Sequence, residues 1–471
     1  MKTDVTMEKI VSLCKRRGFI FPGSEIYGGL AGTWDYGPFG VELKNNIKQL
    51  WWKMFVQDRD DMVGVDAAIL MNPKAWEASG HVSGFSDPLV ECSKCKRRIR
   101  ADQYLENFYI QNPTIVHDVQ TNDLPSLIRD FRSFRAVMKC ENCDAIGTLS
   151  DPRQFNMMFK TNIGASEDAA SVSYLRPETA GGIFVNFKNV IDSIHPKLPF
   201  GIAQIGKAFR NEIAPRDFVF RSREFEQMEV EYFVRPEEWE ASFEEWRQNV
   251  YAFNKAVGIS ESAVYELNVA DEDRAHYSKR TIDFEFDFPF GKKELFGLAY
   301  RTDFDLKAHS EASTVDLSMQ DPETGLKIRP HVIEPSFGVD RAVLAVLTSA
   351  YTEDNLGGEI RTYLKFAPAV APIKAAVFPL LKNKPQLVEK AREVYLALKK
   401  EIPQIMWDDN GNIGKRYRRQ DEIGTPYCIT IDFDTLGEAG EEMKDTVTLR
   451  DRDTGEQRRV PISEIASIIR G

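Results

Sequence analysis

The chain has 471 residues, of which 42% are hydrophobic and 28% are charged, a balance typical of globular proteins with roughly two to four domains. Its net charge of −11 argues against a protein that coats nucleic acid indiscriminately, although a local basic strip remains compatible with that charge. No apolar run approaches the ~20 residues that cross a bilayer, and the N-terminus lacks the apolar core of a signal peptide, so we expect a cytoplasmic protein without a membrane segment.

The first third of the chain begins with a helix and a strand. Apolar positions at helical spacing predict a long helix over residues 41–57. Residues 63–71 predict a strand that ends before Asn72-Pro73. Residues 91–150 differ in composition, with four cysteines, basic clusters and a polar middle. We interpret this segment as an insertion.

Two more strands and a helix follow. Residues 203–212 and 221–233 predict strands joined by a loop, and residues 237–256 carry large apolar side chains at steps of three and four, which indicates a helix packed on the core. Residues 281–288 alternate strictly, which is typical of a half-buried antiparallel strand. The fold class predicted for residues 1–366 is therefore α+β, with antiparallel strands and flanking helices forming a catalytic domain.

A second domain is predicted after a proline-punctuated linker near residue 366. A strand over Ala375 to Phe378, a helix over about 385–400, a short strand near Ile405 and the strand YCITIDF alternate in the manner of a small α/β domain. We assign this domain to residues 370–471.

The motif FRNE, residues 209–212, combines a cation and an acid. If it is part of a strand, Arg210 and Glu212 point to the same face. A guanidinium holds a phosphate with a forked pair of hydrogen bonds, and a carboxylate accepts from an exocyclic amine such as that of adenine. A salt bridge on a surface sheet is the commoner explanation of Arg-x-Glu taken alone.

Three other motifs place charges beside turns or glycines. The sequence RSREFEQMEVEYF puts two cations, an aromatic ring and polar side chains on one strand face: Arg221, Arg223, Phe225, Gln227 and Glu229. EPSFGVDR puts Glu334 and Ser336 on a strand face before Gly338 and a helix in which Arg341 needs an anionic partner. RPETAGG places Glu178 in a turn. A solvated strand face, a local ion pair and a helix cap are the respective alternatives.

The order of these motifs is more distinctive than any one of them. A long helix and strand, then FRNE with its returning strand, then EPSFGVDR before a helix, resemble motifs 1, 2 and 3 of the class II aminoacyl-tRNA synthetases. Several long stretches are similar to glycyl-tRNA synthetases of the dimeric type, and the match runs from about residue 7 to the C-terminus: GSEIYGGLAGTWDYGPFGVELKNN, AILMNPKAWEASGHV, YLRPETA, FRNEI, RTDFDL and GNIGKRYRRQDEIGTPYC.

The resemblance implies a six-stranded antiparallel sheet with flanking helices, a C-terminal anticodon-binding domain and an ATP site. Arg210, Arg341 and Glu294 are its implied catalytic residues. Arg210 would hold the α-phosphate, Glu212 would recognise adenine, and Phe225 and Arg341 would sandwich the ring. The full ATP-binding set implied by the resemblance is Arg210, Asn211, Glu212, Phe220, Arg221, Ser222, Arg223, Glu224, Phe225, Glu294, Leu295, Gly338, Val339, Asp340 and Arg341.

A second set of residues is implied for the amino acid. Glu178, Glu229 and Glu334 would surround the glycine ammonium, and the pocket would refuse a Cβ by steric exclusion. The full glycine-binding set is Arg100, Glu178, Phe225, Glu226, Gln227, Met228, Glu229, Glu334, Pro335, Ser336, Phe337 and Gly338. The sequence departs from the family at Gly181, where Gln is common, and at Phe337, where Ala is frequent, and either departure could change the lining near the site without abolishing it.

The implied activity is glycine–tRNA ligation. Glycine attacks the α-phosphate of ATP, which binds with Mg²⁺, and the resulting adenylate passes glycine to the 3′ end of tRNA(Gly). No protein nucleophile is required, so His81, His117, His276 and His331 are interpreted as structural or hydrogen-bonding residues. Synthesis of diadenosine tetraphosphate is an implied side activity, and a homodimer is implied by motif 1. The basic run GKRYRRQ, residues 414–420, is expected to contact RNA, with a solvated helix face as the alternative.

Two CxxC pairs predict a structural zinc site. Cys92 and Cys95 are separated from Cys140 and Cys143 by 44 intervening residues. Four thiolates bind Zn²⁺ tetrahedrally and leave no open position for catalysis. Two coincidental pairs of reduced thiols are the alternative. For the chain as a whole, two other functions stay open: a synthetase for another amino acid, and a non-catalytic relative that keeps the fold.

Overall fold

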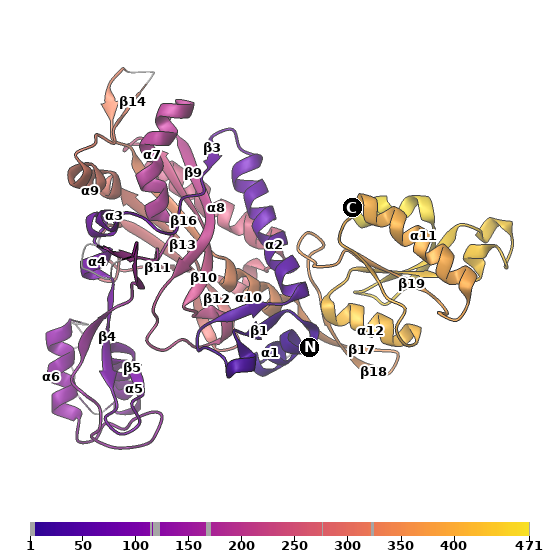
Figure 1. Ribbon diagram of the computed structural model, residues 1–471, viewed down its shortest axis with the longest axis horizontal. Coiled ribbons are helices and arrows are strands. Elements are labelled where there is room, and N and C mark those ends of the chain that lie inside the picture. Colours follow the sequence, from indigo (N-terminus) through magenta and orange to yellow (C-terminus); the bar gives the residue numbers. More distant parts are fainter. Residues whose placement is uncertain are drawn as a thin grey trace.

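The computed structural model of the protein describes residues 5–113, 115, 123–165, 171–275, 277–321 and 325–470. Figure 1 shows a large body, a smaller lobe that hangs from it around β4, β5 and α6, and a C-terminal domain that is joined to the body beside β17 and β18. Within the described ranges, no helix has both the length and the apolar character needed to cross a bilayer.

The body is built on a seven-stranded sheet in the order β11-β12-β13-β16-β10-β9-β3. Neighbouring strands are antiparallel except β3 and β9, which run parallel. The sheet therefore contains the expected antiparallel strands with one parallel strand added at the edge. The strands are β3 (Met62–Gly64), β9 (Phe200–Phe209), β10 (Glu224–Val234), β11 (Val264–Asn268), β12 (Arg280–Phe288), β13 (Gly291–Thr302) and β16 (His331–Gly338).

The two faces of this sheet differ in chemistry because strand side chains alternate. On β10, Met228, Val230 and Tyr232 are buried in the main core, beneath α2 (Pro38–Trp52), α8 (Trp239–Val257) and α10 (Val339–Ala350). The intervening residues Gln227 and Glu229 face the other way and pair in register with Gly338 and Ser336 of β16. Helix α7 (Ala180–Ile194) packs on one end of that second face and leaves the rest to polar side chains.

The predicted elements of the body are largely confirmed, with two corrections. The strand expected over 63–71 ends at Gly64, and beyond it the carbonyl of Ala67 accepts from the Arg176 guanidinium at 2.7 Å. The helix expected over 41–57 continues beyond Trp52 as a π-helical turn. The alternating strand and the aromatic helix appear as β12 and α8. The other elements of the body are α1 (Met7–Arg17), β1 (Ile20–Pro22), β2 (Trp34–Tyr36), α3 (Pro73–Ala78), α4 (His81–Gly84), β7 (Lys160–Asn162), β8 (Val172–Tyr174), α9 (Phe304–Ser313), β14 (Met319–Gln320) and β15 (Lys327–Ile328).

The cysteine-containing segment forms a lobe with its own small core. Leu105, Phe108, Leu127 and Phe131 pack together with buried parts of the cysteine pairs. The lobe contains β4 (Ser86–Glu91), β5 (Arg98–Arg100), α5 (Ala101–Gln111), α6 (Leu124–Phe134) and β6 (Arg153–Asn156). A separate core is what allows a segment to be inserted without disturbing its host fold.

The C-terminal domain carries the β/α alternation predicted for it. Its five-stranded sheet has the order β20-β19-β21-β22-β23, and its apolar core is distinct from that of the body. A hairpin of β17 and β18 connects α10 to this domain. The elements are β17 (Tyr351–Leu356), β18 (Glu359–Leu364), β19 (Ala375–Pro379), α11 (Pro385–Glu401), β20 (Ile405–Trp407), α12 (Ile413–Ile423), β21 (Tyr427–Ile431), β22 (Thr446–Asp451), β23 (Gln457–Pro461) and α13 (Ile465–Arg470).

Candidate active site

A cavity of about 360 Å³ lies on the polar face of the sheet, over β10, β12, β13 and β16. It brings together residues from all four charged motifs, which are spread over residues 176–341. Of the residues expected from the sequence, those lining the cavity are Glu178, Arg210, Glu212, Phe220, Arg221, Ser222, Phe225, Glu226, Gln227, Glu229, Glu294, Leu295, Glu334, Ser336, Gly338, Asp340 and Arg341.

Arg210 does not sit in a strand as expected from FRNE. Strand β9 ends at Phe209, and the backbone N–H of Arg210 bonds to the carbonyl of Arg223, which also precedes its strand. The guanidinium turns back to donate to the carbonyl of Pro177 at 3.1 Å and lies 5.3 Å from the ring centres of Phe85 and Phe225. This leaves a cation on an aromatic platform inside the cavity.

A second cation, Arg341, lies across the cavity. It contacts the Glu294 carboxylate at 3.0 Å, donates to the Glu294 carbonyl at 3.1 Å, and has its guanidinium carbon 4.6 Å from the Phe220 ring. The neighbouring Arg341 lowers the pKa of Glu294, against the effect of burial. Two arginines and two aromatic rings, Phe220 and Phe225, therefore line this end of the cavity, and they suit a phosphorylated planar ligand.

Glu229 is held by five hydrogen bonds. One oxygen accepts from the backbone N–H groups of Thr179 (3.0 Å) and Ala180 (2.9 Å) and from the Thr179 hydroxyl. The other accepts from Gln227 (2.7 Å) and Ser336 (2.8 Å). The carboxylate thus caps the start of α7, where a negative charge is stabilised by the helix dipole. It fixes Ser336 and the turn that carries Glu178.

Glu178 is positioned by His81. The His81 Nε2 atom lies 3.4 Å from the carboxylate, and its Nδ1 atom is 2.8 Å from the Ser79 hydroxyl. Burial alone would raise the pKa of Glu178, but His81, Arg301 and Arg210 outweigh burial and lower it to about 2. Glu178 is therefore a carboxylate at neutral pH.

Glu334 shares a buried cation with Asp305. Arg301, which is 2% exposed, donates to Glu334 at 2.9 Å and to both oxygens of Asp305 at 2.8 Å. Its guanidinium carbon is 3.8 Å from the centre of the Tyr277 ring. Burial raises the pKa of Glu334, Arg301 opposes this, and the nearby carboxylates of Glu229 and Glu178 add to the rise. This end of the cavity has more carboxylates than cations.

Buried Glu231 extends this excess of acid. It lies two residues beyond Glu229 on β10 with no exposed surface, and among the described residues neither of its oxygens has a hydrogen-bond partner. Burial raises its pKa well above the ordinary value, and Glu334 contributes in the same direction. Glu231 is therefore a buried acid beside the acidic end of the cavity, and it is not one of the residues that line the cavity.

Eight of the expected site residues are not among those lining the cavity. Arg100 pairs with Asp87 and Asp102 at the base of the lobe. Met228, Phe337 and Val339 point into the main core, so a contact with substrate there would come from backbone atoms. Asn211, Arg223, Glu224 and Pro335 complete this group.

The two departures from the family pattern also lie away from the cavity. Phe337 is buried between Phe55, Phe253 and Phe296. Gly181 lies in the first turn of α7, where a Cβ would stand 2.8 Å from the Trp76 ring, so a larger side chain requires Trp76 to move. Both positions therefore belong to the packing around the site and not to the lining of the cavity.

Asp340 and Glu226 belong to a buried polar cluster at the edge of the cavity. One oxygen of Asp340 accepts from Tyr36 (2.5 Å) and Lys44 (3.1 Å), and the other accepts from the backbone N–H of Glu226 (2.7 Å). Lys44 also pairs with the Glu226 carboxylate at 2.7 Å. These groups bind helix α2, strand β10 and the start of α10 together, so the acids are occupied by protein partners.

Several functional candidates were missed in the sequence. Asp283, Tyr277 and Gly297 line the cavity, and Arg301 donates to Glu334. Asp283 lies in an ordinary alternating strand, Tyr277 in a turn and Arg301 in the segment RTDF, so none of the four charged motifs contains them. His81 was expected to be a structural or hydrogen-bonding residue, which its contacts with Ser79 and Glu178 bear out, but the sequence did not identify these partners. Alternation does place Asp283 on the face opposite the buried Ile282 and Phe284, which was a usable signal. His117 and His276 lie outside the described residues.

The four cysteines of the lobe converge. Their sulfur atoms all lie within 4.8 Å of one another, with Cys92 and Cys143 at 3.8 Å and Cys95 and Cys140 at 3.7 Å. Tetrahedral Zn²⁺ with Zn–S bonds of about 2.3 Å requires about 3.8 Å between sulfurs. The four thiols and their spacing fit tetrahedral zinc better than they fit two unrelated pairs of reduced thiols.

Several side chains of the basic run in α12 bind groups within the protein, which the sequence did not predict. Arg416 is buried and donates to the carbonyls of Pro379, Asp409 and Gly411, and Arg419 is paired with Asp408. Tyr417 packs on Phe378 and bonds to Thr430. The expected contact of this entire run with RNA is therefore corrected: Arg416, Arg419 and Tyr417 stabilise the domain.

Comparisons with known proteins agree with this geometry. Residues 159–350 match the model of the tRNA synthetase class II core domain (G, H, P, S and T), and residues 374–471 match the anticodon binding domain model. A glycine–tRNA ligase from Caldanaerobacter subterraneus subsp. tengcongensis is 51% identical over 99% of this chain and 98% of its own length. Glycine–tRNA ligases from Alkaliphilus oremlandii and Clostridium tetani are each 52% identical over 100% of this chain and 99% of their own lengths.

Proposed function

The chain belongs to the glycine–tRNA ligase family of class II aminoacyl-tRNA synthetases and joins glycine to tRNA, and we propose that the cavity over β10, β13 and β16 is where it activates glycine with ATP. The observation that carries this proposal is the division of the cavity into a cationic aromatic end and an acidic end. ATP carries phosphates and a planar base, and glycine carries an ammonium group, so the two ends match the two substrates.

Arg210 is proposed to hold the α-phosphate during attack by the glycine carboxylate. Its position on the Phe85 and Phe225 rings, with no carboxylate bound to it among the described residues, leaves its charge for a ligand. Negative charge develops on the phosphate oxygens in the transition state, where a preorganised cation has its largest effect. Phe225 and Arg341 are proposed to flank the adenine, and Glu212 to recognise its amine.

At the acidic end, Glu178 and Glu334 are proposed to bind the glycine ammonium. Glu229 is already saturated by donors, so its proposed role is to hold Ser336 and the Glu178 turn in place. Ionised Glu178 supplies the charge, and Arg301 fixes the direction of Glu334. Glycine has no side chain to bind, so its two charged ends provide the affinity.

Mg²⁺ is proposed to enter with ATP. Glu294 and Asp283 both line the cavity, and the carboxylate of Glu294 helps raise the pKa of Asp283, which places two hard oxygen ligands near each other. Bound there, Mg²⁺ would neutralise phosphate charge and orient the leaving pyrophosphate. The cysteine cluster is proposed to hold a structural zinc ion.

The remaining parts of the assignment are also proposals. The bound partner is tRNA(Gly), with residues 1–366 as catalytic domain, 91–150 as insertion and 370–471 as anticodon-binding domain. A homodimer and a cytoplasmic location are proposed by analogy with this class of enzymes. An adenylate held in the cavity can also react with a second ATP, whose γ-phosphate displaces glycine to give diadenosine tetraphosphate.

Binding of a non-hydrolysable glycyl-adenylate analogue, measured by calorimetry, tests the proposed site. The wild-type chain is expected to bind the glycyl analogue, and Arg210→Ala to lose about a hundredfold or more in affinity. The control is Lys188→Ala, which removes an exposed ion pair with Asp192 on α7. Equal affinity in the wild type and Arg210→Ala would place the adenylate elsewhere.

A further inference from the structure

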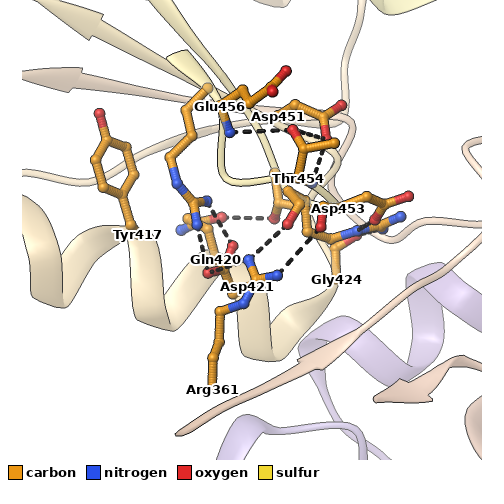
Figure 2. Close-up of polar contacts among 12 residues, drawn as sticks. Arg361, Tyr417, Gln420, Asp421, Gly424, Asp451, Asp453, Thr454 and Glu456 are labelled. Carbon is orange, nitrogen blue, oxygen red and sulfur yellow. Dashed lines mark hydrogen bonds and ion pairs between the residues drawn. The ribbon is translucent and has the colours of Figure 1, made fainter. Parts of the chain in front are cut away.

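A second concentration of buried charge lies between the β17–β18 hairpin and the C-terminal domain. Arg361, Asp421, Arg450 and Arg452 are each at most 4% exposed. Figure 2 shows Arg361 reaching from its hairpin toward Asp421 and the loop of Asp453. This group of residues, here called the joint, contains none of the residues that line the cavity.

Arg361 of β18 is bound on both sides of the joint. Within the hairpin, its Nε atom donates to Asp354 at 2.9 Å. Across the joint, its Nη1 atom donates to the carbonyl of Arg452 at 2.7 Å and to the carboxylate of Asp421 at 3.3 Å. A planar guanidinium with fixed donor directions meets all of these acceptors in a single arrangement of the two parts.

The groups of the C-terminal domain that accept from Arg361 are themselves held in place by other contacts. Asp421, at the end of α12, is already held by a forked pair of bonds from Arg450 at 2.7 and 2.9 Å. Arg452 donates to the carbonyl of Gly424 at 2.8 Å and to that of Phe366, in the linker, at 3.0 Å. Gly424 has φ +79°, and a Cβ there would lie 2.3 Å from the Phe366 ring. The linker is therefore packed tightly against the domain.

A second set of contacts fixes the same domain to helix α2. The Gln404 side chain donates to Asn46 at 2.7 Å and to Glu42 at 3.1 Å. Asn46 in turn donates to the linker carbonyls of Val370 (3.2 Å) and Ala371 (2.9 Å). Domains joined by a linker move relative to each other unless their interface restrains them. Two polar joints on different elements remove that freedom.

Buried ion networks contribute little net stability, because desolvation offsets most of their attraction, but they accept only one geometry. The hairpin that carries Arg361 follows directly from α10, whose first turn contains Arg341 of the cavity. One helix and one hairpin thus connect the cavity to the joint.

We propose that Arg361 and Asp421 are positioning residues that hold the C-terminal domain at a fixed place relative to the cavity, so that one tRNA is bound at both. The inference rests on the proposed function, in which the cavity receives the tRNA 3′ end. A tRNA held at two rigidly spaced sites binds with an effective concentration that flexible attachment does not provide. Glycine activation needs no tRNA and is independent of the joint.

The test compares three reactions of the full-length chain carrying Arg361→Gln. Charging of full-length tRNA is expected to lose about 10- to 100-fold in kcat/KM, mostly through KM, because the two-site attachment is weakened. Glycine-dependent pyrophosphate exchange and charging of an acceptor-stem minihelix, which lacks the anticodon, are expected to stay within about threefold. Arg361→Lys keeps the charge without the forked guanidinium, and its kcat/KM for full-length tRNA is expected to lie between those of the wild type and Arg361→Gln.

The matched control is Glu359→Gln, two residues away on β18, which removes an exposed ion pair with Arg418 and is expected to change no reaction by more than about threefold. Gln404→Ala, at the second joint, should show the same split between tRNA charging and pyrophosphate exchange, even if Arg361→Gln folds poorly. Parallel loss of all three reactions, or unchanged charging of full-length tRNA, would overturn the proposal. Absence of glycine-dependent exchange in the wild type would instead contradict the proposed function.

Discussion

The cavity and the joint both contain buried charges, but each buried charge of the joint has an ionic protein partner, whereas one end of the cavity has more carboxylates than cations. Asp421 is bound by Arg361 and Arg450, and Arg452 is satisfied by carbonyls. Beside the cavity, Glu334 and Asp305 share the buried cation Arg301, and the charge of Arg301 also acts on Glu178 and Glu231. Matched charges fix a structure, whereas an excess of one sign is retained where a ligand of the opposite sign binds.

The largest effect on folding is expected where a shared cation is removed. Arg301→Met leaves Asp305 and Glu334 buried without their guanidinium, which costs about 3–5 kcal/mol of unfolding free energy. Urea denaturation followed by circular dichroism measures this loss. Arg247→Met, which breaks half-exposed ion pairs with Glu244 and Glu266, is the control and is expected to cost less than about 1 kcal/mol. Equal losses of unfolding free energy in the two variants would show that Arg301 stabilises the fold no more than a half-exposed arginine does, and would contradict the prediction.

An intermediate effect is expected when the cysteine cluster loses its metal. Wild-type protein should contain one zinc ion per chain by atomic absorption, and Cys92→Ser should lose it, since three thiolates bind less tightly than four. Limited proteolysis should then cut within the lobe, whose own core is small. Cys14→Ser, a buried cysteine outside the cluster, should retain the zinc. Metal-free wild-type protein after refolding with zinc would contradict the assignment.

A smaller effect, confined to high pH, is expected at Asp283. Burial and the nearby Glu294 raise the pKa of Asp283 to about 7, above its value in the unfolded chain. The folded state therefore binds this proton more tightly, so the contribution to stability is complete at low pH and is lost as the pH rises through about 7. Asp283→Asn should match the wild type in unfolding free energy near pH 4 and exceed it at pH 8. A pH-independent difference between the two proteins would exclude this titration.

The sequence was sufficient for the periodic elements and for residues in recognisable motifs. Alternation predicted β12, and the aromatic stripe predicted α8, because burial imposes those periods. It was insufficient for Arg210, which was expected in a strand, because its side chain is directed by the carbonyl of Pro177, 33 residues earlier. Such long-range contacts have no local signature.

The same reason explains the residues that were missed or misplaced. His81 acquires its role only from Glu178, and Arg301 from Glu334, partners that lie in other segments. Asp340 lines the cavity, but its carboxylate accepts from Tyr36 of β2 and Lys44 of α2. Sequence motifs indicated which residues meet, but the hydrogen-bond partners decided which of them stay available to a ligand.

The central claim is that Glu178 and Glu334 in the cavity bind the ammonium of glycine for reaction with ATP. Pyrophosphate exchange in the presence of glycine, alanine or serine tests it most directly, in the wild type, Glu178→Gln and Glu334→Gln. We predict exchange with glycine alone, and an increase in the glycine KM of about tenfold or more in each variant, since each removes a charge-assisted contact. Glycine-dependent exchange that is unchanged in both variants would contradict the claim.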